Sequence, residues 1–152
     1  MFRNALFSSK MNELKKQIGV ILIVAMADIR NNMENKGINA SGRTSSSLKV
    51  ESYDKGIRLV SSGENIAPFG TLEVGRKGSK VPKGFAQILY QWSIDKAISF
   101  DKDRERRTFA YLLARKIARE GTERHRNPRT DIYSEVIKKV VQDIENKAFV
   151  RI

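Results

Sequence analysis

The side chains best suited to contacting a partner lie together in one loop, from Gly75 to Lys83. Within nine residues this loop carries Arg76, Lys77, Lys80 and Lys83, interrupted by glycine and without an acidic residue. Its Gly-Arg-Lys-Gly-Ser-Lys run lacks the Gly-Lys-Ser/Thr ending of a nucleotide-binding phosphate loop. A cationic loop between two apolar elements is typical of a segment that contacts a partner, so we predict a docking loop.

Side chains that could support catalysis are few. The chain has no cysteine and one histidine, His125, so thiolate metal sites are excluded and the imidazole has no second ligand in its neighbourhood. Two carboxylate pairs, Asp101 with Asp103 and Glu120 with Glu123, offer the oxygen ligands that Mg²⁺ prefers. Both pairs lie near predicted helix ends among arginines, where capping and ion pairing account for them. We therefore expect no enzyme activity, no metal site and no cofactor.

A row of basic side chains is predicted on a helix of about Asp103 to Glu120. Arg104, Tyr111, Arg115 and Arg119 are seven, four and four residues apart, so they lie along one side. The net charge of +12 and the pI of about 10.1 are compatible with a polyanionic neighbour such as nucleic acid. Any amphipathic helix, however, must turn charged residues to solvent. Both interpretations, a DNA-facing row and a solvated face, stay open.

These side chains must be positioned by the elements around them, of which the first is a long helix expected from about Lys10 to Lys36. Its segment Ile18–Ala27 is apolar on two sides, whereas a helix on the surface of a small monomer has one apolar stripe. The second side is covered either by the rest of the domain or by a neighbouring subunit. Because a chain of 152 residues has few elements left to cover it, we predict a subunit interface. The interface residues are Val20, Ile23, Val24 and Ala27.

A small antiparallel sheet is expected after the long helix. Residues Leu48–Tyr53 and Ile57–Ser61 alternate apolar and polar side chains around an Asp-Lys-Gly turn, which is a usual hairpin sequence. Residues Thr71–Val74 alternate in the same way, so a third strand is expected there. We therefore predict a sheet of three or four strands with the long helix packed on one face.

Two or three further helices are expected towards the C-terminus, over about Gly84–Ile98, Asp103–Glu120 and Asp131–Ala148. The predicted fold class is α+β, in a single domain of residues 1–152 whose first eight residues are expected to be mobile. The N-terminus lacks a signal-peptide pattern, and the longest apolar run is too short to span a bilayer. A soluble intracellular protein without membrane contact is therefore expected.

Several short motifs follow one another between about residues 38 and 125. They are Leu-Glu-x-Gly-Arg at Leu72–Arg76, Lys-x-Pro at Lys80–Pro82, Trp92 with Lys96–Ile98, Ala110 with Tyr111, and the run Ala114–Thr122, preceded by Ala40–Thr44 and Ser47 with Leu48. In this order and spacing the chain resembles the tail-completion, or neck, proteins of tailed bacteriophages.

The resemblance implies a structural virion protein, made in the bacterial cytoplasm and placed at the junction of head and tail. Such a head–tail connector forms a homo-oligomeric ring of six or twelve copies, contacts the portal or neck and the tail proteins, and lets DNA pass. An additional ring in the neck of a crAss-like podovirus also fits this description. The alternative class is a free basic nucleic-acid-binding protein. The two are not exclusive, because DNA passes through such a ring.

Overall fold

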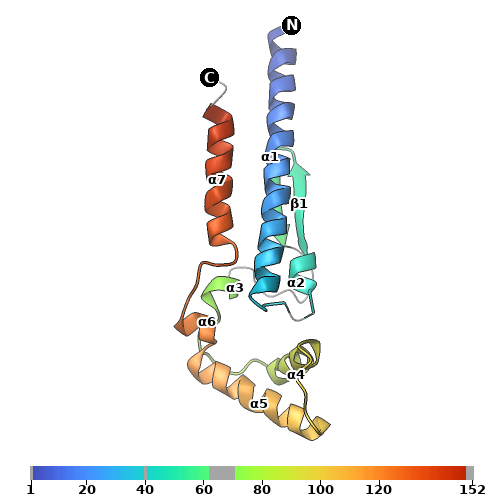
Figure 1. Ribbon diagram of the computed structural model, residues 1–152, viewed down its shortest axis with the longest axis vertical. Coiled ribbons are helices and arrows are strands. Elements are labelled where there is room, and N and C mark those ends of the chain that lie inside the picture. The colour runs from blue at the N-terminus through green and yellow to red at the C-terminus, as the bar shows by residue number, and fades with distance from the viewer. Residues whose placement is uncertain (1, 40, 62–70, 150–152) are drawn as a thin grey trace.

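The computed structural model in Figure 1 describes residues 2–39, 41–61 and 71–149, and these residues combine helices with a small sheet. A long N-terminal helix comes first, a two-stranded antiparallel sheet follows, and further helices complete the chain. The mixed class, the long helix and the C-terminal helices are therefore confirmed. The elements are α1 (Phe2–Asn35), α2 (Arg43–Ser46), β1 (Leu48–Tyr53), β2 (Gly56–Ser61), α3 (Thr71–Val74), α4 (Phe85–Asp95), α5 (Asp103–Glu120), α6 (Glu123–Arg126) and α7 (Ser134–Phe149).

Helix α1 is longer than predicted at its N-terminal end, because it begins at Phe2 and not near Lys10. Its other end is where the sequence predicts it. Gly37 has a φ of 62°, a left-handed conformation that glycine adopts without strain. The backbone N–H of Ile38 donates to the carbonyl oxygen of Met33 (2.9 Å), which closes the last turn.

The two strands form the hairpin that the sequence predicts. They pair antiparallel, with Leu48 opposite Ser61 at the open end. The hairpin packs against α1, as Figure 1 shows. Arg30 of that helix donates hydrogen bonds to the carbonyl oxygens of Ser45 and Leu48 (2.9 and 2.7 Å), which fixes the start of β1 beside the helix.

The third strand expected over Thr71–Val74 is wrong, because these residues form the short helix α3. Alternation over so few residues fits one helical turn as well as a strand. In the helical turn Glu73 is buried while Val74 is exposed, and Gly75, with a φ of 66°, ends the helix. The described residues thus contain two strands, fewer than the three or four expected.

Helix α7 runs antiparallel beside α1, so that α7 and the hairpin flank α1 on different sides (Figure 1). The side-chain amide of Asn32 on α1 donates to the carbonyl oxygen of Ile132 (3.0 Å), just before α7 begins. The main core lies where the two helices meet the start of β1. Its buried members are Ala25, Ile29, Met33, Leu48, Ile132 and Val136.

Helices α4 and α5 form a second, smaller core at the other end of the molecule (Figure 1). Leu89 of α4 packs against Ala110 and Ala114 of α5, whose small side chains let the helices approach closely. Helix α4 ends at Asp95, before the expected Ile98, because Ala97 has a φ of 52°, which is outside the right-handed helical region. We call residues 75–120 the helical arm. Lys96 ties this arm to the end of α1, since its ammonium group donates to the carbonyl oxygens of Gly37 and Asn39.

Candidate interaction surfaces

The predicted interface side of α1 is exposed in the single chain. Val20, Ile23 and Val24 have exposed fractions of 59%, 52% and 52%, and Ala27 is exposed as well. The opposite side of the helix faces the main core. The chain therefore covers one apolar side of α1 and leaves the other in contact with water, which is unfavourable for large aliphatic side chains. We call Val20, Ile23, Val24 and Ala27 the α1 face.

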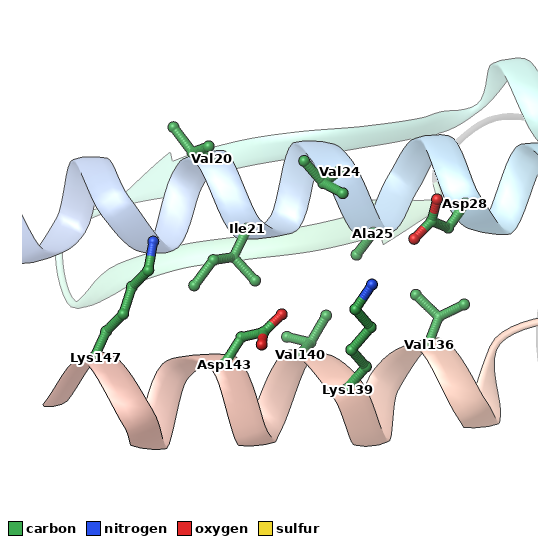
Figure 2. A pocket seen from close by; sticks show the side chains of 10 residues that line it. All are labelled: Val20, Ile21, Val24, Ala25, Asp28, Val136, Lys139, Val140, Asp143 and Lys147. Atoms are coloured by element: carbon green, nitrogen blue, oxygen red, sulfur yellow. The ribbon is translucent and has the colours of Figure 1, made fainter. Parts of the chain in front are cut away.

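A groove between α1 and α7 adjoins the α1 face (Figure 2). It encloses about 200 Å³. Charges of both signs alternate along it, and aliphatic side chains from both helices line it between them. An apolar groove with mixed charges resembles the contact surface of a protein partner more than an anion site. Its lining is Val20, Ile21, Val24, Ala25, Asp28, Val136, Lys139, Val140, Asp143 and Lys147.

Helix α7 carries a second apolar face that does not line this groove. Ile137 and Val141 lie one turn apart and have exposed fractions of 47% and 48%. The sequence of this helix places Val136, Ile137, Val140 and Val141 along one side, and the structure shows that α1 covers only part of that side. We call Ile137 and Val141 the α7 face. The chain thus presents two different apolar faces, one on each of its paired helices.

The first half of the predicted docking loop is held against α5 and α6. The backbone N–H of Ser79 donates to the carbonyl oxygen of Ala118 (2.8 Å). The backbone N–H of Thr122 donates to the carbonyl oxygen of Arg76 (2.9 Å). In return the backbone N–H of Arg76 donates to the Thr122 hydroxyl (2.9 Å). Gly75 lies so close to α6 that a Cβ atom there would overlap its backbone. This half of the loop is part of the fold.

The four cations of the loop therefore have different environments. The guanidinium of Arg76 lies 4.6 Å from the ring centre of Phe85, and the side chain is half-buried. Lys77, Lys80 and Lys83 are exposed. Within the described part of the chain none of these lysines forms an ion pair. The three lysines are available to a partner, whereas Arg76 also supports the loop itself.

The basic row predicted on α5 lies on its exposed side. Arg104, Tyr111, Arg115 and Arg119 are all exposed. Arg119 is paired with Glu120, while Arg115 donates to the Tyr111 hydroxyl (3.2 Å) and lies 5.7 Å from its ring centre. Their exposure agrees with a solvated face and with a DNA-facing row alike.

Glu73 is the glutamate of the Leu-Glu-x-Gly-Arg motif, and the sequence does not predict the structural role that this side chain has. It is only 2% exposed. Its Oε1 accepts hydrogen bonds from the backbone N–H groups of Ile132, Tyr133 and Ser134 (2.8, 2.7 and 2.9 Å), and its Oε2 accepts one from the Ser134 hydroxyl. These N–H groups stand at the start of α7, where helix N–H groups lack internal partners and the helix dipole favours negative charge.

The environment of Glu73 keeps its carboxylate ionised. Burial alone raises the pKa, but the hydrogen bonds from Ser134, Tyr133 and Ile132 outweigh that effect and hold the pKa below its ordinary value. A buried carboxylate in this setting caps a helix from a distant part of the sequence. It joins α3, at the base of the helical arm, to the paired helices α1 and α7.

One carboxylate of each pair considered for Mg²⁺ is engaged in other contacts. Hydrogen bonds from Tyr90 and Arg107 hold the pKa of Asp103 below its ordinary value, and Glu120 pairs with two arginines. His125 is exposed on α6. Among the residues that the structure describes, no three histidine, aspartate or glutamate side chains are grouped to hold a metal ion.

Helices α5 and α7 carry charged residues along their length. In the described ranges no helix combines the length and the apolar character needed to cross a membrane.

The chain was also compared with known proteins, and no family model, no curated protein and no solved structure matches it.

Proposed function

We propose that the chain is a structural virion protein that forms a ring in the neck of a tailed bacteriophage. There it acts as a head–tail connector between the portal and the tail and lets DNA pass. The observation that carries the proposal is the presence of two different exposed apolar faces on one chain, the α1 face and the α7 face. A closed ring requires a heterologous contact, in which two different surfaces of each subunit meet. The motif order that resembles neck proteins supports the same function.

The total surface of the chain also favours assembly. The accessible surface is 11147 Å², whereas a compact monomer of 17.3 kDa exposes about 7,800 Å². The arrangement in Figure 1 is elongated and has two small cores in place of one, which leaves more surface exposed than a compact shape does. Burying apolar faces between copies stabilises an assembly by about 25 cal/mol for each Å² removed from water.

In the proposed ring the α1 face of one subunit packs against the α7 face of the next. Both faces consist of aliphatic side chains at helical spacing, which suits packing of the ridges of one helix into the grooves of another. A ring of six or twelve copies follows from the resemblance, because tails are sixfold and portals twelvefold. Within the docking loop, Lys77 then provides exposed charge for docking to the adjacent ring of the virion.

Electron microscopy of the purified protein tests the proposal. At high concentration the wild-type chain is expected to form rings in negative stain. Val24→Asp introduces a charge into the proposed dry contact and is expected to abolish the rings. Because Val24 is 52% exposed in the single chain, the variant should keep its helical circular dichroism. Asn12→Asp adds the same charge at an exposed position of α1 outside the face, and it should still form rings.

Two results would contradict this assignment. If Val24→Asp forms rings as readily as Asn12→Asp, the α1 face is not the contact. If Val24→Asp fails to fold, the side chain belongs to the core of its own subunit. A wild-type chain that stays monomeric at every concentration and binds DNA would instead be the free nucleic-acid-binding protein considered as the alternative.

A further inference from the structure

Most of the excess positive charge lies on the helical arm. Residues 75–120 hold twelve basic and five acidic residues, a net charge of +7 out of the +12 of the whole chain. These residues are less than a third of the sequence. The charge is therefore concentrated at one end of the molecule, away from the α1 face and the α7 face (Figure 1).

Ion pairs within the chain neutralise only part of this charge. Arg107 pairs with Asp103, and Arg119 pairs with Glu120. By contrast Lys80, Lys83 and Arg115 have no acidic partner among the described residues. All three side chains are exposed. The cations that remain available thus include two from the loop and one from the middle of α5.

Arg115 lines a hollow between the loop, the start of α4 and α5. Lys80 and Lys83 are adjacent in sequence to the lining residues Val81, Pro82 and Gly84. The hollow encloses about 350 Å³. Tyr111 is 53% exposed at its edge, and Val81 is 46% exposed. Arg115 lies over the Tyr111 ring and donates to its hydroxyl, so the ring and the guanidinium are held together. The lining is Val81, Pro82, Gly84, Phe85, Ala86, Tyr111, Ala114 and Arg115.

We propose that this surface binds the phosphodiester backbone of a nucleic acid through Lys80, Lys83 and Arg115. Cations without acidic partners beside an exposed aromatic ring are the features by which proteins hold nucleic acids without reading their sequence. An acidic protein surface would satisfy the lysines but would leave the aromatic hollow empty. A nucleotide offers both an anionic phosphate and a flat apolar base. The inference does not rest on the ring, because a single chain carries the whole surface.

Binding of labelled oligonucleotides by fluorescence anisotropy tests this inference. The arm variant is Lys80→Gln with Lys83→Gln and Arg115→Gln. The matched variant is Lys16→Gln with Lys55→Gln and Lys138→Gln, which removes the same charge from exposed positions on α1, the hairpin turn and α7. Each protein is titrated against a single strand and against a duplex of equal length, at several salt concentrations.

The arm variant should bind at least about tenfold more weakly than the wild type at low salt. Its slope of log affinity against log salt should fall by about 0.7 per lost contact for the single strand or about 0.9 for the duplex. The nucleic acid, single strand or duplex, whose affinity falls more in the arm variant is the form that the surface holds. The matched variant should stay within about threefold of the wild type. Equal losses in both variants would overturn the inference, because net charge alone would then explain binding, and so would no loss in the arm variant.

Discussion

The carboxylate of Glu73 accepts a hydrogen bond from the backbone N–H of Ser134 at 2.9 Å, although 61 residues separate the two in sequence. Ser134 is the first residue of α7, and Glu73 belongs to α3. This contact fixes where α7 begins relative to the helical arm. It therefore sets the position of the proposed ring contact relative to the basic end of the molecule.

Replacing Glu73 is expected to destabilise the fold strongly. Glu73→Ala leaves three backbone N–H groups and one hydroxyl near the start of α7 without their acceptor. We expect the free energy of unfolding to fall by about 3 kcal/mol, measured by urea denaturation. Glu135→Ala removes an exposed glutamate from the first turn of the same helix and is the control, with an expected change within about 0.5 kcal/mol. Equal effects of the two changes would show that the buried cap is unimportant.

The stability of the protein is expected to fall in acid partly because of the same residue. The pKa of Glu73 is lowered by folding from an ordinary value near 4.5. Its contribution is therefore complete above that value and is lost as the pH falls through the lower pKa of the folded state. In urea unfolding between about pH 7 and pH 3, Glu73→Gln should show a shallower loss of stability than the wild type. Some loss should remain, because the hydrogen bond from Arg124 also lowers the pKa of Asp131. If the stability of the wild type and that of Glu73→Gln fall in parallel with pH, Glu73 does not contribute to the acid sensitivity.

Two glycines, one at the start of the docking loop and one directly after it, are expected to differ sharply in their tolerance of alanine. Gly75 and Gly84 both have a positive φ, of 66° and 76°. At Gly75 a Cβ atom would overlap the backbone of α6, whereas at Gly84 no atom lies within 4 Å of it. Gly84→Ala should cost about 1 kcal/mol from backbone strain alone. Gly75→Ala should cost at least about 3 kcal/mol, because the backbone of α6 must move. Similar thermal melting temperatures for the two variants would contradict this packing.

The cations of the docking loop should separate by their effect on stability. Arg76→Ser removes the contact with the Phe85 ring, worth about 0.5 to 1 kcal/mol, while the backbone hydrogen bonds to Thr122 can remain. We expect the melting temperature to fall by about 2 °C. Lys77→Ser removes an exposed charge and should leave the melting temperature unchanged. If Lys77→Ser lowers the melting temperature more than Arg76→Ser does, Arg76 does not support the loop.

Elements with long periodic patterns could be predicted from the sequence, whereas contacts between distant segments could not. Helix α5 begins and ends at Asp103 and Glu120, as the sequence predicts, and the hairpin strands agree to within one residue. The segment Thr71–Val74 is too short for its alternation to distinguish a strand from a helical turn. Its Glu73 accepts hydrogen bonds from residues 59 to 61 positions later, and a local pattern does not show such contacts.

The candidate surfaces were predictable to a similar extent. An apolar second side on α1 is visible in the sequence because its residues recur at helical spacing. The α7 face could not be separated from the core, since periodicity does not show how much of an apolar stripe a neighbouring helix covers. Likewise the charge of the loop is evident from composition, but the burial of Arg76 against Phe85 depends on how the loop folds onto α5.

Mixing two assembly-defective variants tests the proposed ring contact most directly. Val24→Asp disables the α1 face and Val141→Asp disables the α7 face, and both side chains are about half exposed in the single chain. In a heterologous contact each variant alone should be monomeric by light scattering. An equimolar mixture should form a heterodimer and nothing larger, because one intact α1 face meets one intact α7 face. If either variant alone still dimerises, or if the mixture stays monomeric while the wild type assembles, the α1 face does not pack against the α7 face.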